Sequence, residues 1–245
     1  MADAPSSGST ASAPRRFYRE ATVESGAEGF ALSLDGRPAR TPGKARLALP
    51  TRALGDAVAA EWNGQGETID PRAMPLTRLA NSAIDGVSRE MEAVRADLAR
   101  YAGSDLVMYR AGEPDQLVTA QAAAWDPVLA WAHEALGARF VLSQGVMFVE
   151  QPERALALVR VALDAETSAF ALGALHVMTT LTGSVLIALM HAAGRLSAED
   201  AWAAAHVDEV FQESRWGEDH EAMVRRAARQ AEFEWASRFL ALSRA

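Results

Sequence analysis

The sequence has no cysteine and a single lysine, Lys44, among its 245 residues. The absence of cysteine excludes disulfide bridges, thiolate zinc sites, iron–sulfur clusters and a cysteine nucleophile. Arginine therefore supplies nearly all of the positive charge. A reducing compartment is compatible with this composition, although the lack of cysteine does not require one.

Positive charge is scarce overall. Lysine and arginine number 24 against 32 aspartate and glutamate residues, which gives a net charge of −8. This balance argues against a nucleic-acid binder, because the affinity of such proteins comes largely from neutralising phosphates. A protein or a small molecule is the more natural partner.

A long hydrophobic run is also absent. The apolar stretch Val177–Met190 is the only candidate for a membrane span, and His176 and His191 flank it. A helix that spans a bilayer needs about 20 apolar residues. We therefore expect a buried central helix and no membrane insertion.

The residues that are present indicate a globular protein, with 49% hydrophobic and 23% charged residues. The first segment, Met1–Pro14, contains no large apolar residue after Met1 and is predicted to be a disordered tail. It has neither the apolar core of a signal peptide nor the arginines of a transit peptide. A cytoplasmic location is therefore expected.

Period-two alternation predicts β-structure near the N-terminus. Strands are expected over 17–24 and 30–34, and the following Asp35-Gly36 is typical of a type I′ hairpin turn. Pro38 and Pro42 place the next strand at a sheet edge, because proline cannot donate a ladder hydrogen bond.

Helices follow this β-structure. Thr51 is the expected N-cap of a helix that Gly64 ends, and a second short helix is expected to end near Gly86. Together with the strands, these helices would form a small β-rich domain over residues 15–86.

The rest of the chain shows helical periodicity. Ser88 is the expected cap of the first helix, and Asp126-Pro127 has the composition of a new helix start. A single long helix is predicted over Thr167–Ala193. Residues 140–149 are expected to form a short hairpin or an extended loop, and a short extended piece is expected over Leu106–Tyr109.

Two further helices are predicted near the C-terminus. Ser197 is the expected cap of a helix that ends by Gly217. Asp219 is the expected cap of the final helix. The apolar residues predicted to share one face of that final helix are Val224, Ala228, Ala231, Trp235 and Phe239. The fold class is therefore α+β, with a small β-rich N-terminal domain over 15–86 and a larger all-α C-terminal domain over 87–245.

Signatures of catalysis are missing. The sequence has no phosphate-binding loop, no complete dinucleotide fingerprint and no nucleophile elbow. His206 and Glu209 lie one helical turn apart, but a third strong metal ligand is lacking. We expect no catalytic residue, no cofactor and no metal. The competing hypothesis is an enzyme that uses carboxylates with His206 or His220 on the helical domain.

The segment Asp208–Glu221 is unusually acidic, with six acids against Arg215. The simplest interpretation is a solvated helix face followed by the acidic first turn of the last helix. The alternative is an acidic docking site with an aromatic anchor at its edge. The candidate partner-binding residues are Glu209, Asp208, Gln212, Glu213, Trp216, Asp219 and Glu221.

Short motifs occur along the chain in a characteristic order. They are Arg16-Phe17-Tyr18, Leu34-Asp35-Gly36-Arg37-Pro38, Arg40-Thr41-Pro42, Glu61-Trp62 with Gln65, Met74-Pro75-Leu76-Thr77, Leu79-Ala80, Ala83-Ile84-Asp85, Tyr101, Asp105-Leu106, Tyr109-Arg110, Gln121, Trp125-Asp126-Pro127, Leu181-Thr182-Gly183-Ser184, Asp208-Glu209, Gln212, Trp216-Gly217, Asp219 and Glu221. In this order they resemble the ATP synthase assembly chaperone family of the ATP-twelve type. The resemblance covers about Arg15 to Phe239.

The resemblance implies a non-enzymatic chaperone that binds the free α subunit of the catalytic head of ATP synthase and promotes assembly of the αβ hexamer. It also implies a β-rich N-terminal domain and a helical C-terminal domain. The acidic segment of the family maps onto 208–221, with Glu209 as the first candidate for client contact. A bacterial cytoplasmic protein is expected, or a mitochondrial matrix protein in a eukaryote. An adaptor with another client stays open as an alternative.

Overall fold

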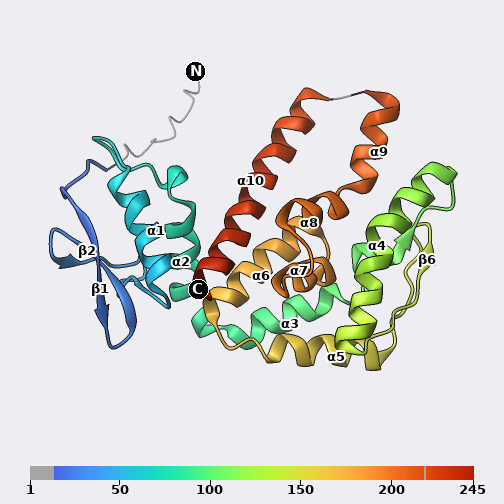
Figure 1. Ribbon diagram of the computed structural model, residues 1–245, viewed down its shortest axis with the longest axis horizontal. Helices are drawn as coiled ribbons and strands as arrows, with labels where there is room; N and C mark the ends of the chain where they lie inside the picture. The colour runs from blue at the N-terminus through green and yellow to red at the C-terminus, as the bar shows by residue number, and fades with distance from the viewer. Residues whose placement is uncertain (1–13, 218) are drawn as a thin grey trace, which may run out of the picture.

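A computed structural model of the protein describes residues 14–217 and 219–245. The α-helices of this part are α1 (Arg52–Asn63), α2 (Pro75–Asp85), α3 (Met91–Tyr101), α4 (Asp115–Leu136), α5 (Glu153–Asp164), α6 (Ala169–Thr182), α7 (Val185–Ala192), α8 (Ala198–Ala205), α9 (Val207–Trp216) and α10 (His220–Ser243). The strands are β1 (Ala21–Gly26), β2 (Gly29–Leu34), β3 (Arg37–Pro38), β4 (Ala48–Leu49), β5 (Tyr109–Arg110) and β6 (Ser143–Gln144). The sheet with α1 and α2 lies at one end of an elongated molecule, and α4 and α5 lie at the other (Figure 1).

The N-terminal sheet follows the predicted pattern. β1, β2 and β3 are antiparallel, and β3 pairs only with β2, at the edge. The turn residues have positive φ, 48° at Asp35 and 75° at Gly36. β1 begins at Ala21 rather than at residue 17, because the preceding N–H groups of Arg19 and Glu20 bind the Asp35 carboxylate.

Local capping signals near α1 and α2 are confirmed. Thr51 Oγ1 accepts a hydrogen bond from the Leu54 N–H at 3.1 Å, and Gly64 is the C-cap of α1. Leu54 and Val58 are buried on the side of α1 that packs against β1 and β2. Gly86 ends α2 as expected.

The predicted cap at Ser88 is wrong. Ser88 lies in a short 3-10 helix, Val87–Arg89, and its hydroxyl donates to the Ile84 carbonyl at 2.7 Å. The Ser88 side chain is thus bonded to the end of α2, and α3 begins at Met91 with no side-chain cap.

The helix start predicted at Asp126-Pro127 is wrong as well. α4 continues through Pro127 without a break. Trp125, Val128 and Ala132 form a buried stripe at helical spacing on both sides of the proline. Packing along this stripe outweighs the helix-breaking tendency of proline.

The single helix predicted over Thr167–Ala193 is two helices. Gly183 has φ 68° and ends α6, and the Ser184 side chain accepts the Ile187 N–H at 3.0 Å at the start of α7. A left-handed glycine followed by a capping serine is a complete stop-and-start signal. The high apolar content of the stretch conceals that signal.

The helix predicted from Ser197 to Gly217 is also divided. Ser197 Oγ accepts the Asp200 N–H at 3.0 Å, as predicted, and α8 then ends at His206. α9 begins directly afterwards and ends at Gly217.

The C-terminal part is predominantly helical but not all-α. Residues 140–149 do not form a hairpin, because β6 pairs with β5 in parallel, Ser143 opposite Tyr109. The piece predicted as extended before β5 begins as a 3-10 helix, Leu106–Met108. The fold class is nevertheless α+β, with its larger sheet near the N-terminus.

The predicted face of α10 is only partly correct. Phe239 is buried, but Val224, Ala228 and Ala231 are exposed. The residues of α10 that are buried are Phe233, Ala236, Phe239, Leu240 and Ser243. Figure 1 shows the reason, because the beginning of α10 projects beyond the core, whereas its buried residues lie in the second half, where α10 packs against α6 and α2.

The N-terminal and C-terminal parts share one core. α2 packs against α6 and α10, and buried side chains form a continuous cluster from Tyr18 to Leu240. A domain boundary between 15–86 and 87–245 stays a prediction. Most of the predicted tail lies outside the described residues, but Pro14 is described, and its carbonyl accepts the Ile69 N–H at 2.9 Å. Within the described ranges, no helix has the length and apolar content to cross a bilayer.

Candidate functional site

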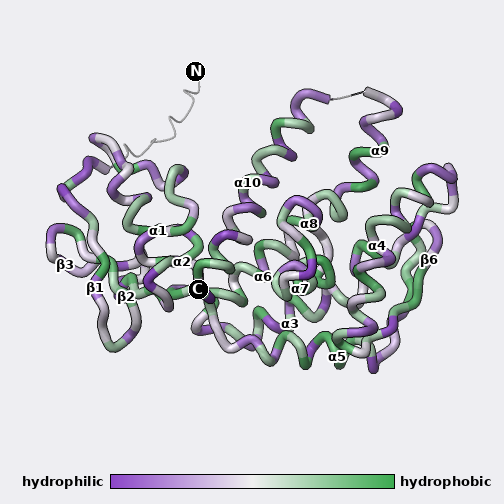
Figure 2. The backbone as a smooth tube through the Cα atoms, in the orientation of Figure 1, coloured by the Kyte–Doolittle hydropathy of each residue, from purple (hydrophilic) through white to green (hydrophobic). Residues whose placement is uncertain are grey.

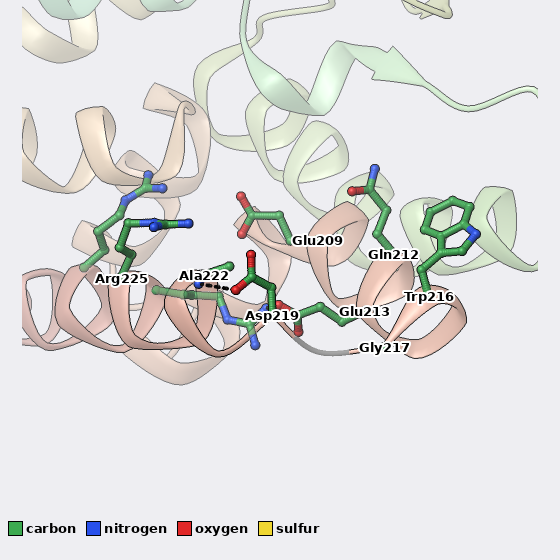
Figure 3. A pocket seen from close by; sticks show the side chains of 10 residues that line it. Glu209, Gln212, Glu213, Trp216, Gly217, Asp219, Ala222 and Arg225 are labelled. Carbon is green, nitrogen blue, oxygen red and sulfur yellow. Dashed lines mark hydrogen bonds and ion pairs between the residues drawn. The ribbon is translucent and has the colours of Figure 1, made fainter.

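The helices α9 and α10 border an open cavity of about 450 Å³ (Figure 3). Five of the seven predicted partner-binding residues line it, namely Glu209, Gln212, Glu213, Trp216 and Asp219. The remaining two, Asp208 and Glu221, are not among the lining residues. The structure therefore brings most of the acidic segment together around one hollow.

The turn between the two helices depends on Asp219. Its Oδ1 accepts hydrogen bonds from the N–H groups of Glu221 at 2.9 Å and Ala222 at 3.5 Å, which caps α10 as predicted. Gly217 ends α9 with φ 89°, in the region that favours glycine. Asp219 therefore holds the helical hairpin in addition to lining the cavity.

Three arginines of α10 also line the cavity, and the sequence analysis missed them. Arg226 Nη1 pairs with Glu213 Oε1 at 2.6 Å, and Arg225 pairs with Glu221 at 3.4 Å. Arg229 donates to the Leu181 carbonyl at 2.7 Å. Among the described residues, three acids and three arginines therefore line the cavity, so it is not a uniformly acidic surface. Their helical spacing, at positions 225, 226 and 229, is the signal that predicts a shared face.

Glu209 differs from the other acids of the segment. Its side chain is 52% exposed, and its nearest recorded ionisable partner is His206, whose Nε2 lies 3.7 Å from Oε2. Burial lowers the pKa of His206, and the His206 Nδ1 hydrogen-bonds the Trp202 carbonyl at 2.8 Å. The imidazole is therefore neutral at pH 7, and no arginine of the described part forms an ion pair with Glu209.

Asp208 faces away from the cavity toward α4. Its Oδ1 accepts a hydrogen bond from Gln121 Nε2 at 2.7 Å, and Trp125 Nε1 donates to the Ala204 carbonyl at 2.6 Å. These two bonds attach α8 and α9 to α4. Asp208 thus has a role in the fold, which distinguishes it from its neighbour Glu209.

Large apolar side chains are exposed at several places of the described structure, among them the end of α9 and the loop after β6. Trp216 is 79% exposed at the end of α9. Val146, Met147 and Phe148 are 94%, 75% and 70% exposed just after β6, in a stretch that Figure 2 shows as hydrophobic. Exposed apolar clusters of this kind mark interaction sites in soluble proteins.

The model of the ATP12 chaperone protein family matches residues 15–133. The crystal structure of Atp12 from Paracoccus denitrificans is 44% identical with a TM-score of 0.90, over 94% of this chain and 98% of that one. The chain belongs to the ATP12 chaperone family.

Two further structures support membership of the ATP12 chaperone family. An aspartate-to-lysine mutant of the Paracoccus protein is 43% identical, with a TM-score of 0.90 and coverage of 94% of this chain and 98% of the mutant. A chaperone candidate from Agrobacterium tumefaciens is 48% identical with a TM-score of 0.88. That match covers 93% of this chain and 85% of the Agrobacterium one.

His206 and His220, the two histidines of the enzyme hypothesis, do not meet in one pocket of this ATP12 family member. His206 is buried and stacks on Trp202 with ring centroids 3.7 Å apart, whereas His220 is exposed in the first turn of α10. Neither lines the cavity beside Glu209. No group of three or more histidine, aspartate or glutamate residues within the described ranges is arranged to hold a metal ion. This geometry gives the enzyme hypothesis no support.

Several acids in the ordered sequence motifs hold the fold. Glu61 accepts hydrogen bonds from the N–H groups of Leu76 at 2.7 Å and Thr77 at 2.8 Å, which caps α2. Asp85 accepts from the Thr41 hydroxyl and the Gly43 N–H, both at 2.7 Å. These contacts connect motifs that are far apart in the sequence.

Asp105 is the most deeply buried of these acids. It is 0% exposed and accepts hydrogen bonds from the N–H groups of Leu186 at 3.0 Å and Val107 at 3.3 Å. Burial raises the pKa of Asp105 to about 6. The carboxyl group therefore joins the start of α7 to the segment before β5.

Proposed function

We propose that this ATP12-family chaperone binds the unassembled α subunit of the catalytic head of ATP synthase and promotes assembly of the αβ hexamer. The single observation that carries this proposal is Glu209, an exposed acid with no cationic partner in the described structure, beside a cavity that ends at the exposed Trp216. An aromatic anchor next to an unpaired charge is a typical arrangement in protein interfaces.

The proposed contact surface consists of the seven predicted partner-binding residues, which differ in how free they are to contact a client. Glu209, Gln212 and Trp216 are exposed and free to contact a client, whereas Glu213 pairs with Arg226. Asp208, Asp219 and Glu221 have hydrogen-bond or ion-pair partners in the described structure. Glu209 is therefore the residue expected to receive a basic side chain of the client.

The need for such a chaperone follows from the chemistry of assembly. An unassembled α subunit exposes apolar surface that β would cover in the hexamer, and such surface self-associates. The exposed apolar side chains of Trp216 and of Val146–Phe148 are suited to cover it transiently. The role needs no catalytic step. A location in the bacterial cytoplasm, or in the mitochondrial matrix of a eukaryote, belongs to the same proposal.

The test is capture of purified subunits on the immobilised protein. Isolated α subunit is expected to bind reversibly, and isolated β subunit is not expected to bind. The assembled αβ hexamer should not bind either, because the interface of α is covered in the hexamer. Addition of β should release α from the chaperone. Equal capture of β, or no capture of isolated α, would overturn the proposal.

A further inference from the structure

A second hollow lies in the N-terminal sheet, far along the chain from α9. Its volume is about 590 Å³, and its walls come from the segment before β1, the β2–β3 turn and the end of α1. The lining residues are Phe17, Tyr18, Leu34, Asp35, Arg37, Pro38, Ala39, Arg40 and Trp62. We call this hollow the aromatic–arginine groove.

One wall of the aromatic–arginine groove is a rigid aromatic cluster. Tyr18 is only 5% exposed, packs against Trp62 with ring centroids 5.5 Å apart, and donates its hydroxyl hydrogen to the Trp62 carbonyl at 2.7 Å. Phe17 sits edge-on against Tyr18 at 5.4 Å, yet it is 73% exposed. A phenyl ring held in place but left open to solvent is a ready contact for an apolar side chain.

The other wall carries positive charge. Arg37 and Arg40 are exposed, and Arg40 Nη1 donates to the Lys44 carbonyl at 2.8 Å, so its charge is not neutralised. Within the described residues, none of the basic side chains of this hairpin, Arg37, Arg40, Lys44 and Arg46, forms an ion pair with an acid.

Asp35, the one acid that lines the groove in the described part of the chain, is already engaged. The Asp35 carboxylate accepts hydrogen bonds from the N–H groups of Glu20 at 2.9 Å and Arg19 at 3.0 Å. These bonds lower the pKa of Asp35, so that it stays ionised and fixed to the backbone. The two arginines therefore outnumber it in the groove.

The charge of this region opposes that of the whole molecule. Residues 14–50 contain seven basic and four acidic residues, although the chain carries a net charge of −8. An acidic partner is repelled by most of the surface and attracted here. Guanidinium groups bind carboxylates through two parallel hydrogen bonds, which makes arginine suited to this recognition.

The edge position of β3 decides how a partner would bind. Pro38 has no N–H to donate, so a partner strand cannot extend the sheet along β3 by a regular ladder. Recognition would instead use side chains, with carboxylates on Arg37 and Arg40 and an apolar group on Phe17.

We propose that the aromatic–arginine groove binds an acidic segment of the client that carries an apolar side chain between or beside its carboxylates. This inference rests on the proposed function, because the client is the α subunit. It adds a second contact of opposite charge to the one at Glu209. A basic side chain of the client would meet α9, and an acidic segment of it would meet the β2–β3 hairpin.

The experiment measures the affinity for isolated α subunit of the wild type and of two charge-matched variants. The double variant Arg37→Glu/Arg40→Glu is expected to bind at least tenfold more weakly, because two attractions become repulsions. The control Arg154→Glu/Arg195→Glu changes the net charge equally at exposed arginines elsewhere and should stay within twofold. Phe17→Ala tests the apolar contact. It should weaken the affinity about fivefold, because the variant loses the contact that Phe17 would bury against the client.

The outcomes separate this inference from the proposed function. If wild type binds α and the Arg37/Arg40 variant with a wild-type melting temperature binds equally well, the groove inference is overturned and the proposed function stands. If wild type does not bind α, both are overturned. If charge reversal prevents folding, the neutral variant Arg37→Gln/Arg40→Gln replaces it in the same measurement. Its affinity for the α subunit is expected to be about threefold weaker than that of wild type.

Two additional measurements address other occupants. A labelled single-stranded DNA that binds wild type but not the Arg37/Arg40 variant would reassign the groove to nucleic acid. A dimer of the wild type that the variant converts to a monomer would reassign it to a second copy of the chain. Either result would overturn the proposal, which predicts no DNA binding and an unchanged oligomeric state.

Discussion

The three acids that are hydrogen-bonded within the fold, Glu61, Asp85 and Asp105, differ from Glu209 on α9 in what surrounds them. Glu61 and Asp105 each accept hydrogen bonds from two backbone N–H groups, and Asp85 accepts one from a backbone N–H and one from a hydroxyl. Glu209 has only a neutral histidine 3.7 Å away and is half exposed. Residues of one chemical type, found in one ordered set of motifs, thus serve two purposes. Glu61, Asp85 and Asp105 hold the fold, whereas Glu209 is available for the proposed contact with a client.

This difference has an energetic meaning. A buried N–H that loses its acceptor costs about 1–3 kcal/mol, since no water replaces the bond. An exposed carboxylate with no partner contributes little to folding, so its replacement leaves stability nearly unchanged. The two groups should therefore separate cleanly when stability and client binding are measured on the same variants.

The largest effect is expected at Asp105. At pH 5, below the raised pKa of about 6, Asp105→Ala should lower the free energy of unfolding by about 2 kcal/mol or more, because the N–H groups of Leu186 and Val107 lose their acceptor in the core. Urea denaturation measures the change. A loss below about 0.5 kcal/mol would show that Asp105 is not a structural acid and would break the comparison.

A smaller loss is expected at Glu61. Glu61→Ala removes the carboxylate that caps α2, and loss of a helix cap costs about 0.5–2 kcal/mol. Glu61→Gln keeps the shape and one acceptor oxygen, so it should retain part of the stability. The same denaturation experiment compares the two variants, and an alanine variant as stable as wild type would refute the capping role.

The pH dependence of stability distinguishes the buried Asp105 further from the exposed Glu209. Because burial raises the pKa of Asp105 to about 6, the buried charge disfavours folding above that pH. Its contribution to stability is fully present below the unfolded pKa near 4 and is lost as the pH rises through about 6. On acidification from pH 7 to pH 5, this group should therefore add about 1 kcal/mol of stability.

The control for this pH effect is Asp105→Asn, which cannot titrate. The difference between the wild-type and Asp105→Asn stability profiles should change by about 1 kcal/mol over that interval, which isolates Asp105 from all other groups. Thermal or urea unfolding at each pH gives the profiles. Parallel profiles would show that the carboxyl group does not titrate in this range.

Local signals explain how much of this could be predicted from the sequence. Thr51, Asp219 and the Asp35-Gly36 turn act through neighbours a few residues away, so their roles follow from the sequence alone. The continuity of α4 through Pro127 does not follow from local signals, because packing on both sides of the proline decides the local structure. The sequence therefore predicts turns and caps better than it predicts helix continuity.

The candidate site divides in the same way. The acids of 208–221 are adjacent in sequence and were found, whereas the three cavity arginines of α10 reach them only through the fold. The Glu213–Arg226 pair joins two helices, and no local pattern specifies it. The isolation of Glu209 from a cationic partner is likewise a property of the packed hairpin.

The most direct test of the account pairs stability with client capture for Glu209→Lys. Its melting temperature should match wild type, with a change in stability within about 0.5 kcal/mol, because the side chain is exposed and lacks a cationic partner. Its affinity for isolated α subunit should fall more than tenfold, since an interfacial attraction becomes a repulsion. The control is Glu134→Lys, the same charge reversal at an exposed position of α4, which should keep both properties. A Glu209→Lys protein that melts normally and captures α as well as wild type would contradict the account, and one that unfolds would show that Glu209 is structural, as Glu61 and Asp105 are.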